Sequence, residues 1–191
     1  DGDKDDENMQ SKCHALIAIS ALCEDSSLVP FIVQDGIIPE LLSLLKLEKG
    51  SHYEELYLHV AFLLNKLSMA TVAAKDLYQV ASSLVGQTQE ANENAVTYSI
   101  AALRRMCEDK TIRSTNTVEF LRKHCNLDIV ERCREVASCL YNLALWVDAR
   151  EHIIKSGIFG CISSLAKSYD EETARFALGA LANIANDTRY H

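Results

Sequence analysis

Apolar residues in the last third of the chain recur at the three- and four-residue spacing of amphipathic helices. Residues 151–156 predict a short first helix, which Gly157 ends by taking a left-handed conformation that other residues resist. Residues 158–167 predict a second helix, and a longer third helix follows. The predicted buried stripe of that third helix consists of Ala174, Ala177, Leu178, Leu181 and Ile184.

We expect the third helix to begin at a capping box, in which the Ser168 hydroxyl accepts an early backbone N–H and Glu171 reaches back. Residues 51–54 show a second box of the same kind. The residue fifteen positions beyond the serine is Asn183 in one case and Lys66 in the other. The distance along the sequence from the capping serine to this position is therefore the same in both third helices.

The same order of helices recurs along the chain. A shift of 121 residues superposes residues 15–46 on residues 136–167 without a gap, and Gly36 then pairs with Gly157. This shift is close to three periods of about 40 residues, a length typical of helical repeat proteins. The sequence therefore predicts stacked repeats.

One position near the end of each third helix, called the ladder position below, recurs at spacings of 45, 39, 37 and 41 residues. Its occupants are Ala21, Lys66, Arg105, Asn142 and Asn183. The predicted third helices span approximately residues 11–24, 51–68, 90–108, 128–146 and 169–186.

Two third-helix segments, residues 139–144 and 180–185, resemble the armadillo pattern of a small residue, Leu, any residue, Asn, Leu and Ala. Residues 36–45 resemble the start of an armadillo second helix, with Pro39 in its first turn. The resemblance covers residues 11–191. It implies an all-α fold, a right-handed α-α superhelix of about four to four-and-a-half armadillo repeats, and we expect it to be a piece of a longer array.

Two stretches resemble the family less. Residues 69–87 lack the glycine between first and second helices. Residues 110–127 are shortened, with residues 117–125 as a second helix and little first helix.

Composition and charge narrow the function classes. The 191 residues are 48% hydrophobic and carry a net charge of −8, so the chain can bury a large core and has no general attraction to nucleic acid or anionic membranes. The acidic, apolar-free start predicts a disordered tail over residues 1–10, followed by one armadillo-repeat domain over residues 11–191. No apolar run reaches the length of a membrane span.

Seven cysteines occur, and several lie on apolar helical faces. An odd count in a chain with a full core favours reduced, buried thiols over disulfides. We therefore expect an intracellular protein, cytoplasmic, with a nuclear location left open. The cysteines are Cys13, Cys23, Cys107, Cys125, Cys133, Cys139 and Cys161.

No sequence motif indicates catalysis. Phosphate-binding loops, nucleophile elbows and HExxH helices are absent from the sequence. His124, Cys125 and Cys133 offer metal-ligating atoms but lack the paired spacing of zinc sites. We expect no enzyme activity, no cofactor, no metal and no small-molecule substrate.

The armadillo resemblance implies that third helices line a concave groove, where ladder asparagines hydrogen-bond the backbone of an extended peptide. Here only Asn142 and Asn183 match, while Lys66 and Arg105 place charge at the ladder position. Import receptors of the family carry tryptophan four residues earlier, and a basic localisation peptide would find no such slots here. Those positions hold Ile17, Phe62, Ala101, Ser138 and Gly179.

Helical spacing adds Phe62 one turn before Lys66 and Tyr98 two turns before Arg105. Arg175 lies about two turns before Asn183. The predicted groove is thus a basic and aromatic strip, suited to an extended, acidic segment of a partner protein.

An alternative for these side chains is purely structural. Lys66 and Arg105 would then be solvated or paired with Glu55 and Glu108, and the aromatic rings would pack between repeats. Trp146, one turn beyond a ladder asparagine, is more consistent with packing than with a ligand slot.

The leading hypothesis is a non-catalytic scaffold that binds other proteins through extended peptide segments. A second hypothesis is a regulatory or structural armadillo arm of a larger enzyme, such as a ubiquitin ligase or an NAD-cleaving enzyme. A third hypothesis is catalysis by residues of this chain itself.

Overall fold

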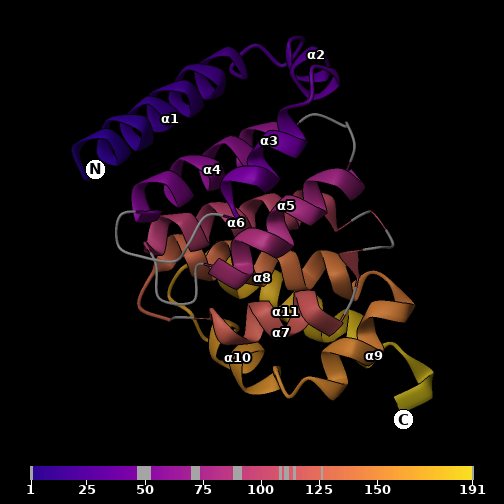
Figure 1. Ribbon diagram of the computed structural model, residues 1–191. Helices are drawn as coiled ribbons and strands as arrows, with labels where there is room; N and C mark the ends of the chain where they lie inside the picture. Colours follow the sequence, from indigo (N-terminus) through magenta and orange to yellow (C-terminus); the bar gives the residue numbers. More distant parts are fainter. Residues whose placement is uncertain are drawn as a thin grey trace. The chain divides into compact units, whose positions relative to one another are not determined.

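The computed structural model describes residues 2–46, 53–69, 74–87, 92–107, 109, 112–113, 115–125 and 127–190. Throughout these residues the regular secondary structure is helical (Figure 1), which confirms the all-α prediction. The chain divides into two compact units, residues 1–102 and 103–191, and the division falls inside helix α6, Glu93–Met106.

The first unit pairs its long helices. α1 packs against α4, and both α3 and α4 pack against α5. Leu56, Leu63 and Leu64 of α4 are completely buried. The helices are α1 Gly2–Leu22, α2 Val29–Gln34, α3 Ile37–Leu44, α4 Glu54–Leu67, α5 Ala74–Gln87 and α6 Glu93–Met106, which crosses into the second unit.

The start of α1 differs from the disordered tail predicted over residues 1–10, because the helix already begins at Gly2. Lys, Glu, Met and Gln in this stretch have good helix propensity. Acidic residues also favour the positive N-terminal end of a helix. Gly2 and the aspartates have low helix propensity, so the favourable position of their acidic neighbours at the N-terminal end and the continuity with the amphipathic segment support this part of α1.

Glycine separates neighbouring short helices where the backbone must turn left-handed. Gly36 between α2 and α3 has φ +94°. Gly157, between α9 (Val147–Lys155) and α10 (Phe159–Leu165), has φ +73°, as predicted. A Cβ at either position would touch nothing within 4 Å, so φ alone requires glycine. Residues 74–87, which contain no glycine before Gly86, form one uninterrupted helix.

The second unit is built around the packing of α8 on α11. Its helices are α7 Thr115–Lys123, α8 Val130–Ala144, α9 Val147–Lys155, α10 Phe159–Leu165, α11 Glu171–Ala185 and a 3-10 turn η4 Thr188–Tyr190.

The buried stripe of α11 is rotated from the predicted one. Leu178 is 55% exposed, so its placement in the stripe was wrong, and Ala174 and Leu181 are only half-buried. Successive helix residues are separated by about 100°, so a stripe displaced by one position moves a side chain off the packed face. The buried residues are Thr173, Ala177, Ala180 and Ile184.

The cap of α11 is Asp170, whereas the sequence predicted Ser168. The Asp170 carboxylate accepts hydrogen bonds from the Thr173 N–H at 2.9 Å and the Thr173 hydroxyl at 2.6 Å. Arg134 Nη2 on α8 donates to the same carboxylate at 2.7 Å, while the Ser168 hydroxyl accepts from the Asp170 N–H. Asp170 therefore caps α11 and ties it to α8. Ser51, the other predicted cap, lies outside the described residues.

Cys125 and Cys161 form a disulfide, so the prediction of reduced thiols is wrong for this pair. The other five cysteines form no disulfide and are buried, as expected. Disulfides persist mainly in oxidising compartments. The cysteines therefore no longer indicate an intracellular location. Among the described residues, no helix has the length and apolarity needed to cross a membrane.

The disulfide generates a test of stability. It joins residues separated by 36 positions, and closing a loop of that length stabilises the folded chain by about 4 kcal/mol in the chain-entropy model. We expect reductant to lower the thermal unfolding midpoint of the wild type and to leave a Cys125→Ser/Cys161→Ser variant unchanged. Calorimetry with and without dithiothreitol measures this, and a wild-type midpoint insensitive to reductant would contradict the pairing.

Asp170 generates a test of pH dependence. The Arg134 guanidinium, followed by the Thr173 hydroxyl and N–H, holds the pKa of the Asp170 carboxyl well below its usual range. The resulting stabilisation is fully present above the unfolded pKa, about 4, and is lost as pH falls through the native value. Asp170→Asn should therefore lower the free energy of unfolding at pH 7.

The deficit of Asp170→Asn should shrink steadily below about pH 4. Urea denaturation across this range is the measurement, and Asp35→Asn is the control for losing one exposed carboxylate. A deficit that stayed constant down to the lowest accessible pH would rule out this role for the ionised carboxylate.

Candidate functional site

The ladder residue of the first unit is held by an internal ion pair. Lys66 lies in the last turn of α4, and its Nζ pairs with the carboxylate of Glu24, which follows the end of α1. The Lys66 side chain is 16% exposed and that of Glu24 is 67% exposed. Glu55, the partner considered from the sequence, instead lies 3.8 Å from His59.

Two aromatic rings adjoin Lys66. Phe62 and Tyr98 contact edge to face with ring centroids 5.2 Å apart, and Lys66 Nζ lies 5.3 Å from the Phe62 centroid. This geometry is that of a cation–π contact. The structure thus brings together the three residues predicted for the middle of the strip, and both rings remain partly exposed.

The second unit uses its ladder asparagine in a comparable way. Asn142 Nδ2 donates to the backbone carbonyl of Arg104 at 3.3 Å, in the last turn of α6. Carbonyls in the last turn of a helix lack intrahelical donors and carry its negative end. Lys66 and Asn142 therefore both bind groups at or just beyond the C-terminal end of the preceding third helix.

Asn183, the last ladder residue, has a buried amide nitrogen without a hydrogen-bond partner among the described residues. An unpaired buried donor is costly, about 1–3 kcal/mol. Because this nitrogen is buried, a carbonyl group of a bound chain would reach it only after the Asn183 side chain turned outward. Asn183 thus has unused capacity that Asn142 lacks.

Arg105 lies half-buried beside Arg104. Burial, and then the neighbouring Arg104 charge, lower the pKa of the Arg105 guanidinium, while Glu135 opposes that shift. Arg104 itself pairs with Glu135 at 2.7 Å. The local charge around this ladder position is therefore partly neutralised.

An aromatic ring of the protein packs against Gly179, the residue four positions before Asn183. A Cβ on Gly179 of α11 would lie 2.8 and 2.9 Å from ring carbons of Tyr141 on α8. Phe176 lies beside that ring, with centroids 5.8 Å apart. Glycine is needed here because the ring approaches the backbone directly.

Arg175 extends this cluster outward. Its guanidinium lies 4.6 Å from the Phe176 ring centroid, and it is 69% exposed although Glu172 is 3.6 Å away. Trp146 makes a different contact, because the Arg113 guanidinium covers its ring at 3.5 Å. This contact agrees with the packing interpretation of Trp146.

The candidate metal ligands are not assembled. Cys125 is consumed by the disulfide, and the part of the chain that the structure describes contains no cluster of three or more ligating side chains. Burial, with the charges of Lys123 and Arg132, lowers the pKa of His124 to about 4. His124 is thus neutral at ordinary pH and contacts the ring of Phe120 at 4.5 Å.

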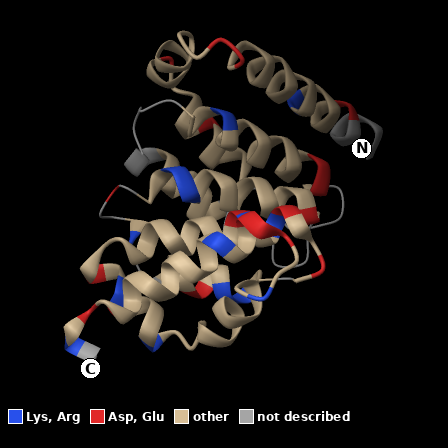
Figure 2. Ribbon diagram, turned by 180° about the vertical axis from the view of Figure 1, so that it is seen from behind, with Lys and Arg blue, Asp and Glu red and all other residues tan. Residues whose placement is uncertain are grey.

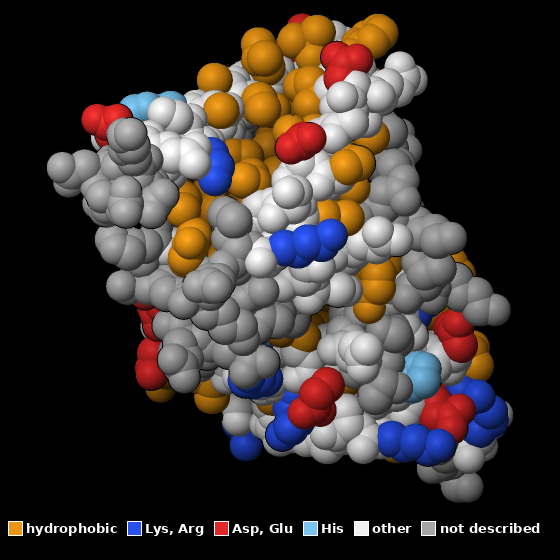
Figure 3. All heavy atoms as spheres, in the orientation of Figure 1, with side chains coloured by type: hydrophobic (Ala, Val, Ile, Leu, Met, Phe, Trp, Pro, Cys, Tyr) orange, Lys and Arg blue, Asp and Glu red, His pale blue; other side chains and the backbone are white. Residues whose placement is uncertain are grey.

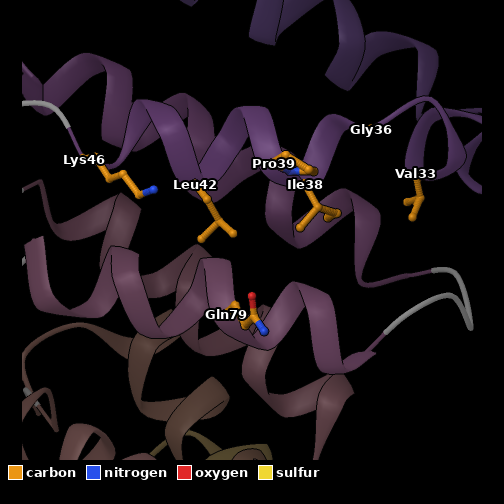
Figure 4. A pocket seen from close by; sticks show the side chains of 7 residues that line it. All are labelled: Val33, Gly36, Ile38, Pro39, Leu42, Lys46 and Gln79. Carbon is orange, nitrogen blue, oxygen red and sulfur yellow. The ribbon is translucent and has the colours of Figure 1, made fainter.

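A pocket of about 500 Å³ lies elsewhere in the first unit, between α2, α3 and α5 (Figure 4). Its lining is mostly aliphatic, and none of the predicted site residues contributes to it. The lining residues are Val33, Gly36, Ile38, Pro39, Leu42, Lys46 and Gln79.

Charged residues of both signs occur along the described helices. Figure 2 shows basic and acidic residues interspersed along the helices rather than gathered by sign. On the face seen in Figure 3, hydrophobic side chains gather over the N-terminal helices. Residues in that part of the chain include Ile17, Leu22 and Phe31, which are 46%, 53% and 63% exposed.

Sequence spacing did not identify Glu24 or Tyr141 as contacts of the third-helix residues.

Comparison with solved structures identifies the fold. Nine chains match. One is a designed armadillo repeat protein in complex with the peptide (KR)4, with a TM-score of 0.75 and 17% sequence identity over 93% of this chain and 81% of that chain. The chain therefore has an armadillo-repeat fold of the α-solenoid class, as the sequence predicted. No protein-family description matches the chain, and no curated protein matches it.

The contact between Tyr141 and Gly179 generates a prediction. Alanine in place of glycine inside a helix normally stabilises by about 1 kcal/mol. We expect Gly179→Ala to fail to do so in the wild type, because its Cβ would displace the Tyr141 ring, and to stabilise in a Tyr141→Ala background. Urea unfolding of the four proteins gives the coupling. Equal gains in both backgrounds would show that the ring does not constrain this position.

Proposed function

We propose that the protein is a non-catalytic scaffold that binds an extended, acidic segment of a partner protein along its third helices. The cluster of Lys66, Phe62 and Tyr98 carries this proposal. In this cluster the Lys66 ammonium group lies at the ladder position and over the ring of Phe62, which in turn contacts the ring of Tyr98. All three residues belong to the first unit.

Each group in the cluster has a role toward such a segment. Lys66 pairs with a partner carboxylate, and the exposed parts of Phe62 and Tyr98 pack against its aliphatic carbons. Lysine and arginine at ladder positions attract acidic residues and repel basic ones, so they contribute to specificity as well as to affinity.

Within the second unit, considered by itself, the ladder asparagines offer recognition of a peptide backbone. Among the described residues the buried amide nitrogen of Asn183 has no acceptor, and in this proposal the side chain turns outward to donate to a carbonyl of the bound segment. To bind the segment, Asn142 would have to replace its hydrogen bond to the Arg104 carbonyl with one to a backbone carbonyl of the segment. Arg105 and the exposed Arg175 supply further positive charge.

The designed neighbour in the structural comparison holds a basic peptide, (KR)4. The shared fold supports binding of an extended peptide, and the ladder charges of this chain favour the opposite sign of ligand. The same surface would serve an armadillo arm of a larger enzyme. A catalytic domain in a longer gene product would favour that alternative.

The proposal predicts binding that depends on charge. An eight-residue peptide of alternating Glu and Asp should bind the wild type, and the (KR)4 sequence should not. Lys66→Glu removes an attraction and adds a repulsion, so it should weaken binding about tenfold at low salt. Arg105→Gln should weaken it less. Fluorescence anisotropy at several salt concentrations measures this, because screening must reduce the affinity.

A matched control is Lys12→Glu, which makes the same charge change on α1 away from the ladder position. It should alter affinity much less than Lys66→Glu. Equal effects of the two reversals would indicate general charge attraction rather than a site, and tighter binding of the basic peptide would overturn the proposed specificity.

A further inference from the structure

Glu24 occupies the position in which an acidic partner would be expected to pair with Lys66. We propose that Glu24 is an internal competitor, a carboxylate of the chain itself that holds Lys66 until a partner carboxylate displaces it. This inference rests on the proposed function and assigns a regulatory contact to the same site.

The two members of the pair differ in how firmly they are held. Lys66 is 16% exposed, because its aliphatic chain is covered and its Nζ lies against the Phe62 ring. Glu24 is 67% exposed and stands in the turn that follows α1. The cation is therefore fixed by packing, whereas the carboxylate can leave into water at little cost.

The backbone around Glu24 keeps its carboxylate close to Lys66. The Glu24 N–H donates to the Ala21 carbonyl at 3.2 Å, and the Asp25 N–H donates to the Leu22 carbonyl at 3.2 Å. These bonds close a tight turn directly after the ladder residue of α1. The next turn is fixed by the Asp25 carboxylate, which accepts from the Ser27 N–H and hydroxyl.

Ala21 adds a second indication. As the ladder residue of α1 it has no polar group to offer a ligand. Glu24, three residues later on, supplies an acceptor to the next ladder position instead. In the free protein Lys66 is therefore paired with a carboxylate of the chain itself, and a partner segment must compete with Glu24 for Lys66.

Removal of the competitor should increase affinity. Exposed ion pairs contribute weakly, so we expect Glu24→Gln to bind the alternating Glu-Asp peptide about two- to fivefold more tightly than the wild type. Any loss of negative charge reduces general repulsion of an acidic peptide. Glu40→Gln, an exposed residue of α3, is the matched control for that general effect.

A double-mutant cycle isolates the pair. In a Lys66→Gln background, Glu24→Gln should have only the effect of the Glu40→Gln control. Circular dichroism of each variant verifies folding, and acetylation of Lys66 by acetic anhydride gives an independent measure. Labelling of Lys66 should be faster in Glu24→Gln than in the wild type and should slow when the peptide is added.

The outcomes separate the inference from the proposed function. If the wild type binds and Lys66→Gln weakens binding, but Glu24→Gln only equals Glu40→Gln or binds more weakly, Glu24 is not a competitor and the scaffold proposal stands. If neither the wild type nor Glu24→Gln binds the acidic peptide, the proposed function fails and this inference with it.

Discussion

Side-by-side packing of the long third helices is the interaction on which the rest of each unit depends. α1 packs on α4 in the first unit, and α8 packs on α11 in the second. The buried face of α4 is formed mainly by aliphatic side chains such as Leu56 and Leu63. Burial of one such side chain contributes about 1.5–3 kcal/mol. This packing fixes which face of each of these helices is buried.

Two of the ladder residues are already engaged within the protein. Lys66 pairs with Glu24, and Asn142 binds the Arg104 carbonyl. In the proposed function, binding of a peptide at these two residues exchanges one partner for another, and only the difference between the two contacts contributes to affinity. Asn183 differs, because its amide nitrogen has no partner to give up among the described residues.

Local features of the fold could be predicted from the sequence, and features that need distant contacts could not. Periodicity identified the long helices, and Gly157 marked a left-handed turn because only backbone sterics decide it. Leu178 was misplaced because several apolar positions on α11 compete for one buried face. The Cys125–Cys161 disulfide and the Glu24–Lys66 pair join residues 36 and 42 positions apart, which no helical spacing reveals.

The ladder position as a binding surface is tested most directly by nuclear Overhauser contacts between the protein and a bound peptide of alternating Glu and Asp. Contacts are expected from the peptide to the rings of Phe62 and Tyr98 and to the side chain of Lys66. Contacts confined to the aliphatic pocket, for example to Val33 and Leu42, with none to α4, would contradict the assignment of the third helices as the binding surface.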